Sequence, residues 1–384
     1  MIARLLTKSD LEQFSQVSST AYIHDAAETT FDETKDIFGT FTDDGILISQ
    51  IECEFNTCWY GEAPLKCASV GGVASRPDYR RLGGVRNTFR AVFENALAKD
   101  CAISILHPFS IGYYRQFGYE PIFRYIKAEC SFKAFEKISR TAEFTLLTEK
   151  HKKEIVEIYT KIAKKSNIMV ARENAEGFCL TPYNSMKHTY FVNDGESAGY
   201  VIVTPDRPTR TITVNEICFT DKKSLQELLS ALRTYDGNYD TVVFEKLPFN
   251  SPVTGLLEDE NKFIKRTLLY GCAGRILNME NVLSANVYPK SHGKFTLKIT
   301  DKQIDENNGI FTVEYENGTC SVSKNIQTEF DIAMDITSAS RIFLGREGLT
   351  VEEISYLPET LINGECEDFI RAFPRRTTQF YGDF

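Results

Sequence analysis

A basic turn that contains two glycines is the part of this sequence best suited to chemistry. Residues 70–86 predict a strand that runs into a turn and then a helix. Unpaired backbone N–H groups at a helix start lie at the positive end of the helix dipole, so they bind an anion without a metal. Gly83 and Gly84 allow close backbone approach, and three arginines add positive charge: Arg80, Arg81 and Arg86. The turn is therefore predicted to hold a pyrophosphate.

The residues missing from this turn narrow the choice of ligand. A dinucleotide site would need Gly-x-Gly-x-x-Gly followed by an acidic residue, and a P-loop would need Gly-Lys-Ser/Thr. The turn has neither pattern. The competing interpretation is an ordinary strand-turn-helix with solvated arginines, which Pro77 and the paired arginines and glycines disfavour.

The turn resembles motif A of the GNAT N-acetyltransferases, in which Arg/Gln-x-x-Gly-x-Gly/Ala binds the pyrophosphate of acetyl-CoA. Arg80, Gly83 and Val85 occupy the three defining positions. Val85 departs from the small residue that is usual there.

Residues 109–120 form a second informative group that is rich in aromatic side chains. In GNAT enzymes the strand after the cofactor helix is followed by a short helix with a tyrosine beside the CoA sulfur, and then by Gly-Phe or Gly-Tyr. We assign Tyr114 to chemistry on this resemblance. We assign Tyr113, Phe117 and Tyr119 to packing at the end of a sheet.

Size and composition limit the class of protein. A chain of 384 residues exceeds one hydrophobic core, so two or three domains are expected. A hydrophobic content of 42% is ordinary for a globular protein, and a net charge of −9 argues against nucleic acid while suiting a cationic substrate. No apolar run approaches the roughly 20 residues that cross a bilayer, and the N-terminus lacks a signal-peptide core, so a cytoplasmic location without membrane contact is expected.

The ten cysteines are scattered and form no Cys-x-x-Cys pair or Cys/His cluster, so no metal site is expected. Most are predicted to be buried thiols. A disulfide between Cys53 and Cys58, the pair nearest in sequence, is disfavoured in a reducing compartment.

Hydrophobic periodicity predicts three regions. The first alternates helices and strands, at residues 7–23, 46–55, 65–74, 84–99 and 101–106. From Thr148 this order repeats without an equivalent of the basic turn, and it includes a helix from Ser224 that pairs with Glu227 in a capping box. After about residue 280, strand pairs and two helices predict an α+β region.

Together these features resemble the Eis (enhanced intracellular survival) family of N-acetyltransferases along the whole chain. The resemblance implies an α/β (α+β) fold with tandem GNAT-like domains, whose mixed sheets are flanked by helices, followed by a sterol-carrier-protein-like α+β domain. The implied boundaries are residues 1–140 for the catalytic domain, 141–278 for a second domain without a cofactor site, and 279–384 for the third. It also implies a hexamer.

The resemblance implies contacts with acetyl-CoA along three segments. A strand would pair with the pantetheine arm, a loop would bind the pyrophosphate, and a pair of residues would follow the next strand. In the same order these residues are Val73, Ala74 and Ser75; Arg81, Leu82, Gly83, Gly84, Val85 and Arg86; and Phe109 and Ser110. The last pair departs from the Ser-Glu pair that is common in the family.

The resemblance also supplies two catalytic roles. Tyr114 matches the tyrosine proposed as the general acid, and the C-terminal carboxylate of Phe384 matches the proposed base. A base must take a proton from the attacking amine, and an acid must neutralise the departing thiolate. His107 is the rival base, with His24 more remote. Asp25, Glu28 and Asp32 either line a polyamine pocket or form a solvated helix face, and we favour the second.

Three functions remain open on the sequence. The first is acetyl transfer from acetyl-CoA to amines of a cationic, aminoglycoside-like small molecule. The second is acetylation of a protein or peptide lysine. The third is a non-catalytic acyl-CoA or lipid-binding module, which is disfavoured because a pure binder has no need for Tyr114.

Overall fold

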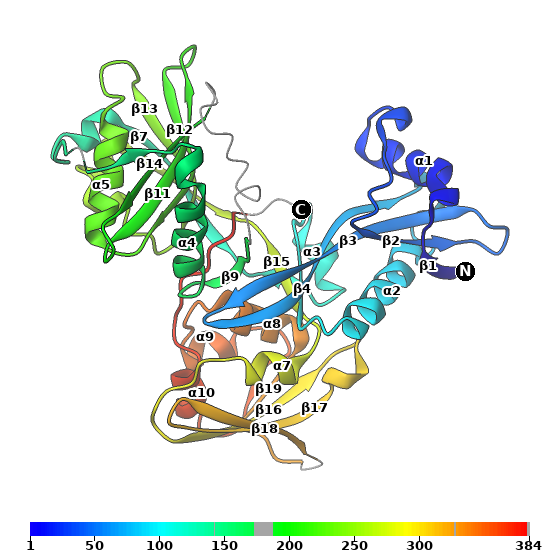
Figure 1. The fold of residues 1–384 in the computed structure, drawn as a ribbon. Coiled ribbons are helices and arrows are strands. Elements are labelled where there is room, and N and C mark those ends of the chain that lie inside the picture. The colour runs from blue at the N-terminus through cyan, green and yellow to red at the C-terminus, as the bar shows by residue number, and fades with distance from the viewer. Residues whose placement is uncertain (142, 173–186, 326–327, 382–384) are drawn as a thin grey trace. The chain divides into compact units, whose positions relative to one another are not determined.

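The computed structural model describes residues 1–141, 143–172, 187–325 and 328–381 (Figure 1). The chain divides into two units that are each discontinuous in sequence. One contains Met1–Ile122 and Cys272–Arg376, and the other contains Phe123–Gly271 and Thr377–Tyr381. Among the described helices, none is both long and apolar enough to cross a membrane.

The first sheet is built around a long antiparallel pair of strands, β3 and β4. β4 then pairs in parallel with β5, and the connection between them runs through α2. The strands of this unit follow the order β1-β2-β3-β4-β5-β15-β6. The elements are β1 (Ile2–Leu5), α1 (Leu11–Tyr22), β2 (Asp36–Phe41), β3 (Leu47–Tyr60), β4 (Ala63–Ser75), α2 (Gly84–Ala98), β5 (Ile103–Leu106), α3 (Ile111–Arg115), β6 (Glu120–Pro121) and β15 (Ala273–Ile276).

Two helices bury their apolar faces against this sheet. The buried face of α2 presents Phe89, Val92 and Phe93 to a core that includes Ile51 and Val70 of the strands. The buried face of α1 joins a separate cluster, and burial from water of these apolar faces fixes both helices on the strands.

The chain passes from the first unit to the second after Ile122 and returns to the first at Cys272. β15 lies between β5 and β6 of the first sheet, although β14, the strand before it in sequence, belongs to the other unit. Conversely, β7 (Arg124–Ser131) follows the first sheet in sequence and pairs with β13 and β14 of the second unit. The unit that holds the basic turn therefore also holds the C-terminal region as far as Arg376.

The C-terminal region forms a five-stranded sheet with the order β18-β17-β16-β19-β20. Its helix α8 also contacts β15 and β6, so it packs on the first sheet as well. The elements are α7 (Met279–Ser284), β16 (Gly293–Thr300), β17 (Gly309–Glu316), β18 (Thr319–Asn325), β19 (Ile332–Asp335), α8 (Ile336–Gly345), α9 (Val351–Ser355), β20 (Leu361–Ile362) and α10 (Glu367–Ala372).

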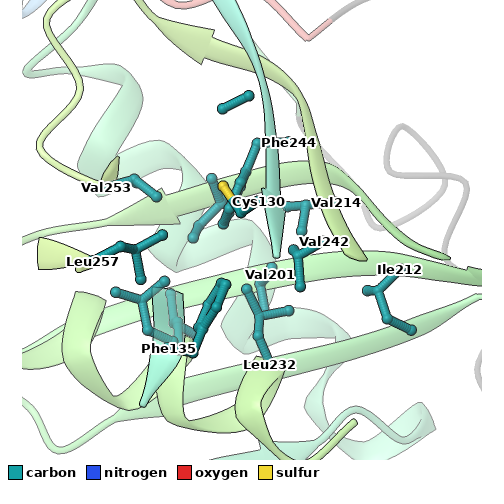
Figure 2. Packing of buried hydrophobic residues seen from close by; sticks show 14 of the residues in the cluster. Cys130, Phe135, Val201, Ile212, Val214, Leu232, Val242, Phe244, Val253 and Leu257 are labelled. Carbon is teal, nitrogen blue, oxygen red and sulfur yellow. The ribbon is translucent and has the colours of Figure 1, made fainter. Parts of the chain in front are cut away.

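The second unit contains a seven-stranded sheet with the order β14-β7-β13-β12-β11-β10-β8. Figure 1 shows α4 and α5 on opposite sides of this sheet. Figure 2 shows side chains of the strands, such as Val201 and Phe244, gathered with Leu232 of α5 in one apolar cluster. The elements are β8 (Thr145–Leu146), α4 (Lys152–Ala163), β9 (Asn167–Val170), β10 (His188–Asn193), β11 (Ala198–Asp206), β12 (Thr211–Phe219), α5 (Lys222–Arg233), β13 (Thr241–Pro248), α6 (Glu260–Phe263) and β14 (Ile264–Tyr270).

The capping box expected in the second unit is displaced by three residues. α5 begins at Lys222, and the side chain of Asp221 accepts from the Ser224 N–H at 2.9 Å, so Asp221 and not Ser224 is the N-cap. The expected partner Glu227 lies inside the helix, where it is buried. Cys53 and Cys58, between which a disulfide is disfavoured, are free thiols, and both are buried.

Candidate functional site

The helix start after the basic turn carries free backbone donors. Gly83 precedes α2 with a φ of +84°, a conformation that glycine adopts without strain, and no side chain caps the helix. The first intrahelical bond runs from the Asn87 N–H to the Gly83 carbonyl at 3.1 Å. The N–H groups of Gly84, Val85 and Arg86 therefore have no partner within the helix. This is the arrangement that binds phosphate.

Close packing fixes this helix start on the sheet. The hydroxyl of Thr40 donates to the Gly84 carbonyl at 3.0 Å. A Cβ at Gly84 would lie 2.9 Å from the Ser49 hydroxyl and 3.1 Å from Ile48, so only glycine lets the helix approach β3 this closely. The backbone donors are thus held rigidly, as an anion site requires.

Three arginines give the loop an excess of positive charge. Arg80, Arg81 and Arg86 are exposed, and among the described residues none forms an ion pair with them. Arg76, by contrast, is paired with Asp78 at 2.8 Å. Three available guanidinium groups beside free backbone donors form a strong electrostatic site for a diphosphate.

The end of β4 offers an open backbone edge. β4 pairs with β5 only between Cys67 and Val70, and the strand continues to Ser75 without β5 beside it. At Gly72 the register with β3 shifts, φ is +54°, and a Cβ would lie 2.4 Å from the Glu52 carboxylate. The bulge therefore requires glycine and leaves the backbone groups after Val70 accessible for an extended ligand.

Tyr114 lies at the inner end of the site, on the short helix α3. Its side chain is 3% exposed, and Phe89, Phe109 and Tyr119 present their rings or edges to it within 6.3 Å. Burial raises the pKa of the Tyr114 phenol, and Tyr22 and Tyr113 raise it further. Tyr114 therefore keeps its proton at neutral pH and is a hydrogen-bond donor.

These features line one cavity of about 1020 Å³. Most of the predicted contact residues reach it, while Ser110 does not line it and instead stands at the start of α3. The lining residues among those predicted are Val73, Ala74, Ser75, Arg81, Leu82, Gly83, Gly84, Val85, Arg86, Phe109 and Tyr114.

The candidate bases are placed unequally. His107 lines the cavity, whereas His24 makes local bonds with Ser18 at 3.1 Å and with the Asp25 carbonyl at 2.8 Å. Among the described residues, no Asp or Glu lines the cavity. The predicted base, Phe384, lies outside the residues that the structure describes.

Two carboxylates of the early acidic stretch accept hydrogen bonds from backbone N–H groups of the same stretch. Asp25 accepts from the Ala27 N–H at 3.0 Å, and Asp32 accepts from the Thr34 N–H at 2.9 Å. Neither residue lines the cavity, and the side chain of Glu28 lies outside the described part. These contacts favour the solvated interpretation over a polyamine pocket.

Sequence reasoning missed Tyr22. It is the last residue of α1, it lines the cavity, and its hydroxyl donates to the Val73 carbonyl at 3.2 Å. The contact depends on how α1 packs against β4, which no local pattern of residues reveals.

The second unit carries no comparable anion site at the start of α5. Only Thr220 and Asp221 separate β12 from α5, and the Asp221 carboxylate already accepts from the first turn. Hydrogen bonds from Ser224 and its neighbours lower the pKa of Asp221 to about 2 against the effect of burial. A negative charge thus stands where a diphosphate would bind.

Family models match three regions of the chain. Residues 3–122 match a model described as an acetyltransferase (GNAT) domain, and residues 171–276 match a second model with that description. Residues 279–351 match a sterol carrier protein domain. No curated protein sequence matches the chain.

Solved structures share the fold over the full chain. A GCN5-related N-acetyltransferase from Anabaena variabilis is 16% identical with a TM-score of 0.85, and 100% of both chains is covered. Eis1 from Mycobacterium abscessus is 17% identical with a TM-score of 0.82 and the same coverage. A probable N-acyltransferase of unknown function from Enterococcus faecalis is 18% identical with a TM-score of 0.84, covering 100% of this chain and 99% of that one. At these identities the likeness establishes the fold alone.

Proposed function

We propose that this chain, which has two GNAT acetyltransferase domains and a sterol carrier protein domain, is an Eis-like enzyme that acetylates amines of a cationic, aminoglycoside-like small molecule with acetyl-CoA. The observation that carries the proposal is the single cavity that joins the free donors of Gly84–Arg86 to the phenol of Tyr114. A diphosphate held at one end leaves a pantetheine arm to run along β4 towards that phenol.

The residues of the loop would hold the co-substrate in three ways. The N–H groups of Gly84, Val85 and Arg86 would donate to the diphosphate, and Arg81 would add charge. The open edge of β4 after Val70 would pair with the pantetheine amides, as an added strand pairs with a sheet edge.

Tyr114 would act on the leaving group. When the amine forms its C–N bond to the acetyl carbon, the C–S bond breaks and a thiolate departs. Transfer of a proton from a phenol of raised pKa to a thiolate in water is unfavourable, because the ordinary thiol pKa is about 8.5. In the dry end of the cavity the thiolate loses hydration too, so the Tyr114 hydroxyl would donate a strong hydrogen bond and then its proton.

The carboxylate of Phe384 would take the proton that the amine loses. The lining of the cavity supports this proposal, because no described Asp or Glu lines it. His107, which does line the cavity, is the rival base. A carboxylate would also attract the ammonium form of the substrate before deprotonation.

A cationic substrate suits the remaining features. The aromatic residues Tyr22, Tyr79 and Tyr113 are among those that line the cavity, and aromatic rings attract ammonium groups. The net charge of −9 adds a long-range attraction. By family resemblance we also propose a hexamer, which light scattering tests.

An activity assay with variants of the two candidate bases tests the proposed function. Thiol release from acetyl-CoA is measured with kanamycin-like amines and with lysine peptides, using the parent protein, a variant without Asp383 and Phe384, and His107→Gln. We expect turnover on the small amines, its loss on removal of the two residues with acetyl-CoA affinity retained, and activity in His107→Gln. Turnover on peptides only would favour lysine acetylation, and binding without turnover would favour a non-catalytic module. Full activity of the shortened chain would rule out the terminal base.

A further inference from the structure

A buried ion pair links the sterol carrier protein domain to the first sheet. Arg275 of β15 and Asp301, which follows β16, are each 0% exposed, and the guanidinium donates to the two carboxylate oxygens at 2.7 and 3.0 Å. Two buried charges are costly to desolvate, and hydrogen bonds to the other atoms of the pair offset part of that cost. We therefore ask which neighbouring segments this buried ion pair holds in place.

Asp301 organises the loop that follows β16. Its carboxylate accepts from the N–H groups of Gln303 at 2.9 Å and Ile304 at 3.3 Å, and from the side-chain amide of Asn307 at 2.9 Å. Together with Arg275 these donors leave the carboxylate fully engaged. The loop conformation and the direction of the arginine are thus set by one side chain.

Arg275 in turn holds the turn after α3. Its guanidinium donates to the Phe117 carbonyl and lies over the Phe93 ring with 4.5 Å to the centroid. Gly118 has a φ of +83°, and a Cβ there would meet the Arg275 guanidinium at 2.2 Å, so the turn is shaped around the arginine. Gln303 adds a second support by donating to the Gln116 carbonyl at 3.2 Å.

This turn also sets the position of Tyr114. The Tyr114 carbonyl accepts from the N–H groups of Phe117 at 2.9 Å and Tyr119 at 3.3 Å, so the tyrosine and the turn share hydrogen bonds. α3 has only five residues, too few to be stable without tertiary support. Support from Arg275 at Phe117 is therefore transmitted directly to the backbone of Tyr114.

We propose that Asp301 and Arg275 are positioning residues for Tyr114, so that the sterol carrier protein domain forms part of the support of the acetyl-transfer site. The proposal rests on the proposed role of Tyr114 as the general acid. A displacement of about 1 Å in a reacting group lowers a rate by roughly 100-fold, so loss of this support acts on kcat. The diphosphate of the co-substrate would bind at the loop before α2, so its binding is expected to stay unchanged.

A double-mutant cycle in the full-length protein tests the proposal. Asp301→Asn keeps the size of the side chain and removes its charge, and Tyr114→Phe removes only the hydroxyl. We expect Asp301→Asn to lower kcat by about 10- to 100-fold with the KM for acetyl-CoA within about twofold of the parent. In the Tyr114→Phe background the same change is expected to lower kcat by less than about twofold. Lys302→Gln, which breaks an exposed ion pair with Glu359 in the same loop, is the matched control.

The outcomes separate the two proposals. Full activity of Tyr114→Phe would refute the acid role itself, and with it the inference that depends on it. Loss of activity in Tyr114→Phe, combined with an equal further loss on adding Asp301→Asn, would refute only the positioning role. If Asp301→Asn does not fold, Gln303→Ala replaces it in the double-mutant cycle. This milder change removes a single hydrogen bond, from the Gln303 side chain to the Gln116 carbonyl. A coupled loss of kcat supports the inference, and an additive or absent loss overturns it.

Discussion

Neutralising two arginines of the loop should weaken binding of acetyl-CoA far more than it slows chemistry. Arg81 and Arg86 line the cavity beside the free N–H groups of α2, and both are exposed. An exposed charge-assisted contact to phosphate contributes ~1 kcal/mol after screening. Loss of two contacts therefore costs ~2 kcal/mol, which is an increase in Kd of about 30-fold.

Isothermal titration calorimetry with the double variant Arg81→Gln, Arg86→Gln measures this change directly. Arg90→Gln is the matched control, because Arg90 is exposed on the same helix and does not line the cavity. The parent Kd should also rise with salt more steeply than that of the double variant, since its binding includes more charge pairs. A change of less than about threefold, or an equal effect of Arg90→Gln, would refute electrostatic binding at this loop.

Three further predictions concern the acid and the stability of the fold. Tyr114→Phe should lower kcat by about 10²- to 10³-fold with an unchanged Kd for acetyl-CoA, because only the proton donor is lost, and stopped-flow detection of thiol release checks this. Asp221→Ala should lower the unfolding free energy of the second unit by ~1 kcal/mol in urea, since the N–H of Ser224 loses its cap, and an equal stability would contradict that role. The Arg4 guanidinium lowers the pKa of Asp10 to about 2, so its stabilisation is complete above the ordinary pKa of about 4 and is lost as the pH falls towards 2. Asp10→Asn should therefore have an unfolding free energy ~1 kcal/mol below that of the parent at pH 6, a value already discounted for the exposure of Arg4. This difference in stability should shrink at pH 2.5. A difference that stayed constant between the two pH values would argue against the ion pair.

Local signals in the sequence predicted the part of the fold that carries the loop. The paired glycines predict a helix start at Gly84, where α2 begins, and strand patterns at 46–55 and 65–74 fall within or beside β3 and β4. These signals succeed because backbone conformation at a glycine turn and alternation on a strand are set within a few residues. The same logic erred at α5, where Asp221 and Ser224 lie three residues apart and both could cap the helix; Asp221 is the N-cap.

Long-range packing decided what the sequence left open. The sequence gives no sign that Arg275, in the short strand β15, will be fully buried, since an arginine is normally exposed. The place of Tyr22 likewise depends on how α1 meets β4, about fifty residues later in the chain. Family resemblance supplied Tyr114, and the cavity that joins it to the loop depends on the tertiary fold.

The central claim is that one cavity holds the diphosphate at the start of α2 and brings the thioester to Tyr114. A crystal structure of the full chain with acetyl-CoA tests it most directly. The account predicts diphosphate oxygens within hydrogen-bond distance of the N–H groups of Gly84, Val85 and Arg86, and the sulfur beside the Tyr114 hydroxyl. Acetyl-CoA bound away from this loop, or a sulfur remote from Tyr114, would contradict it.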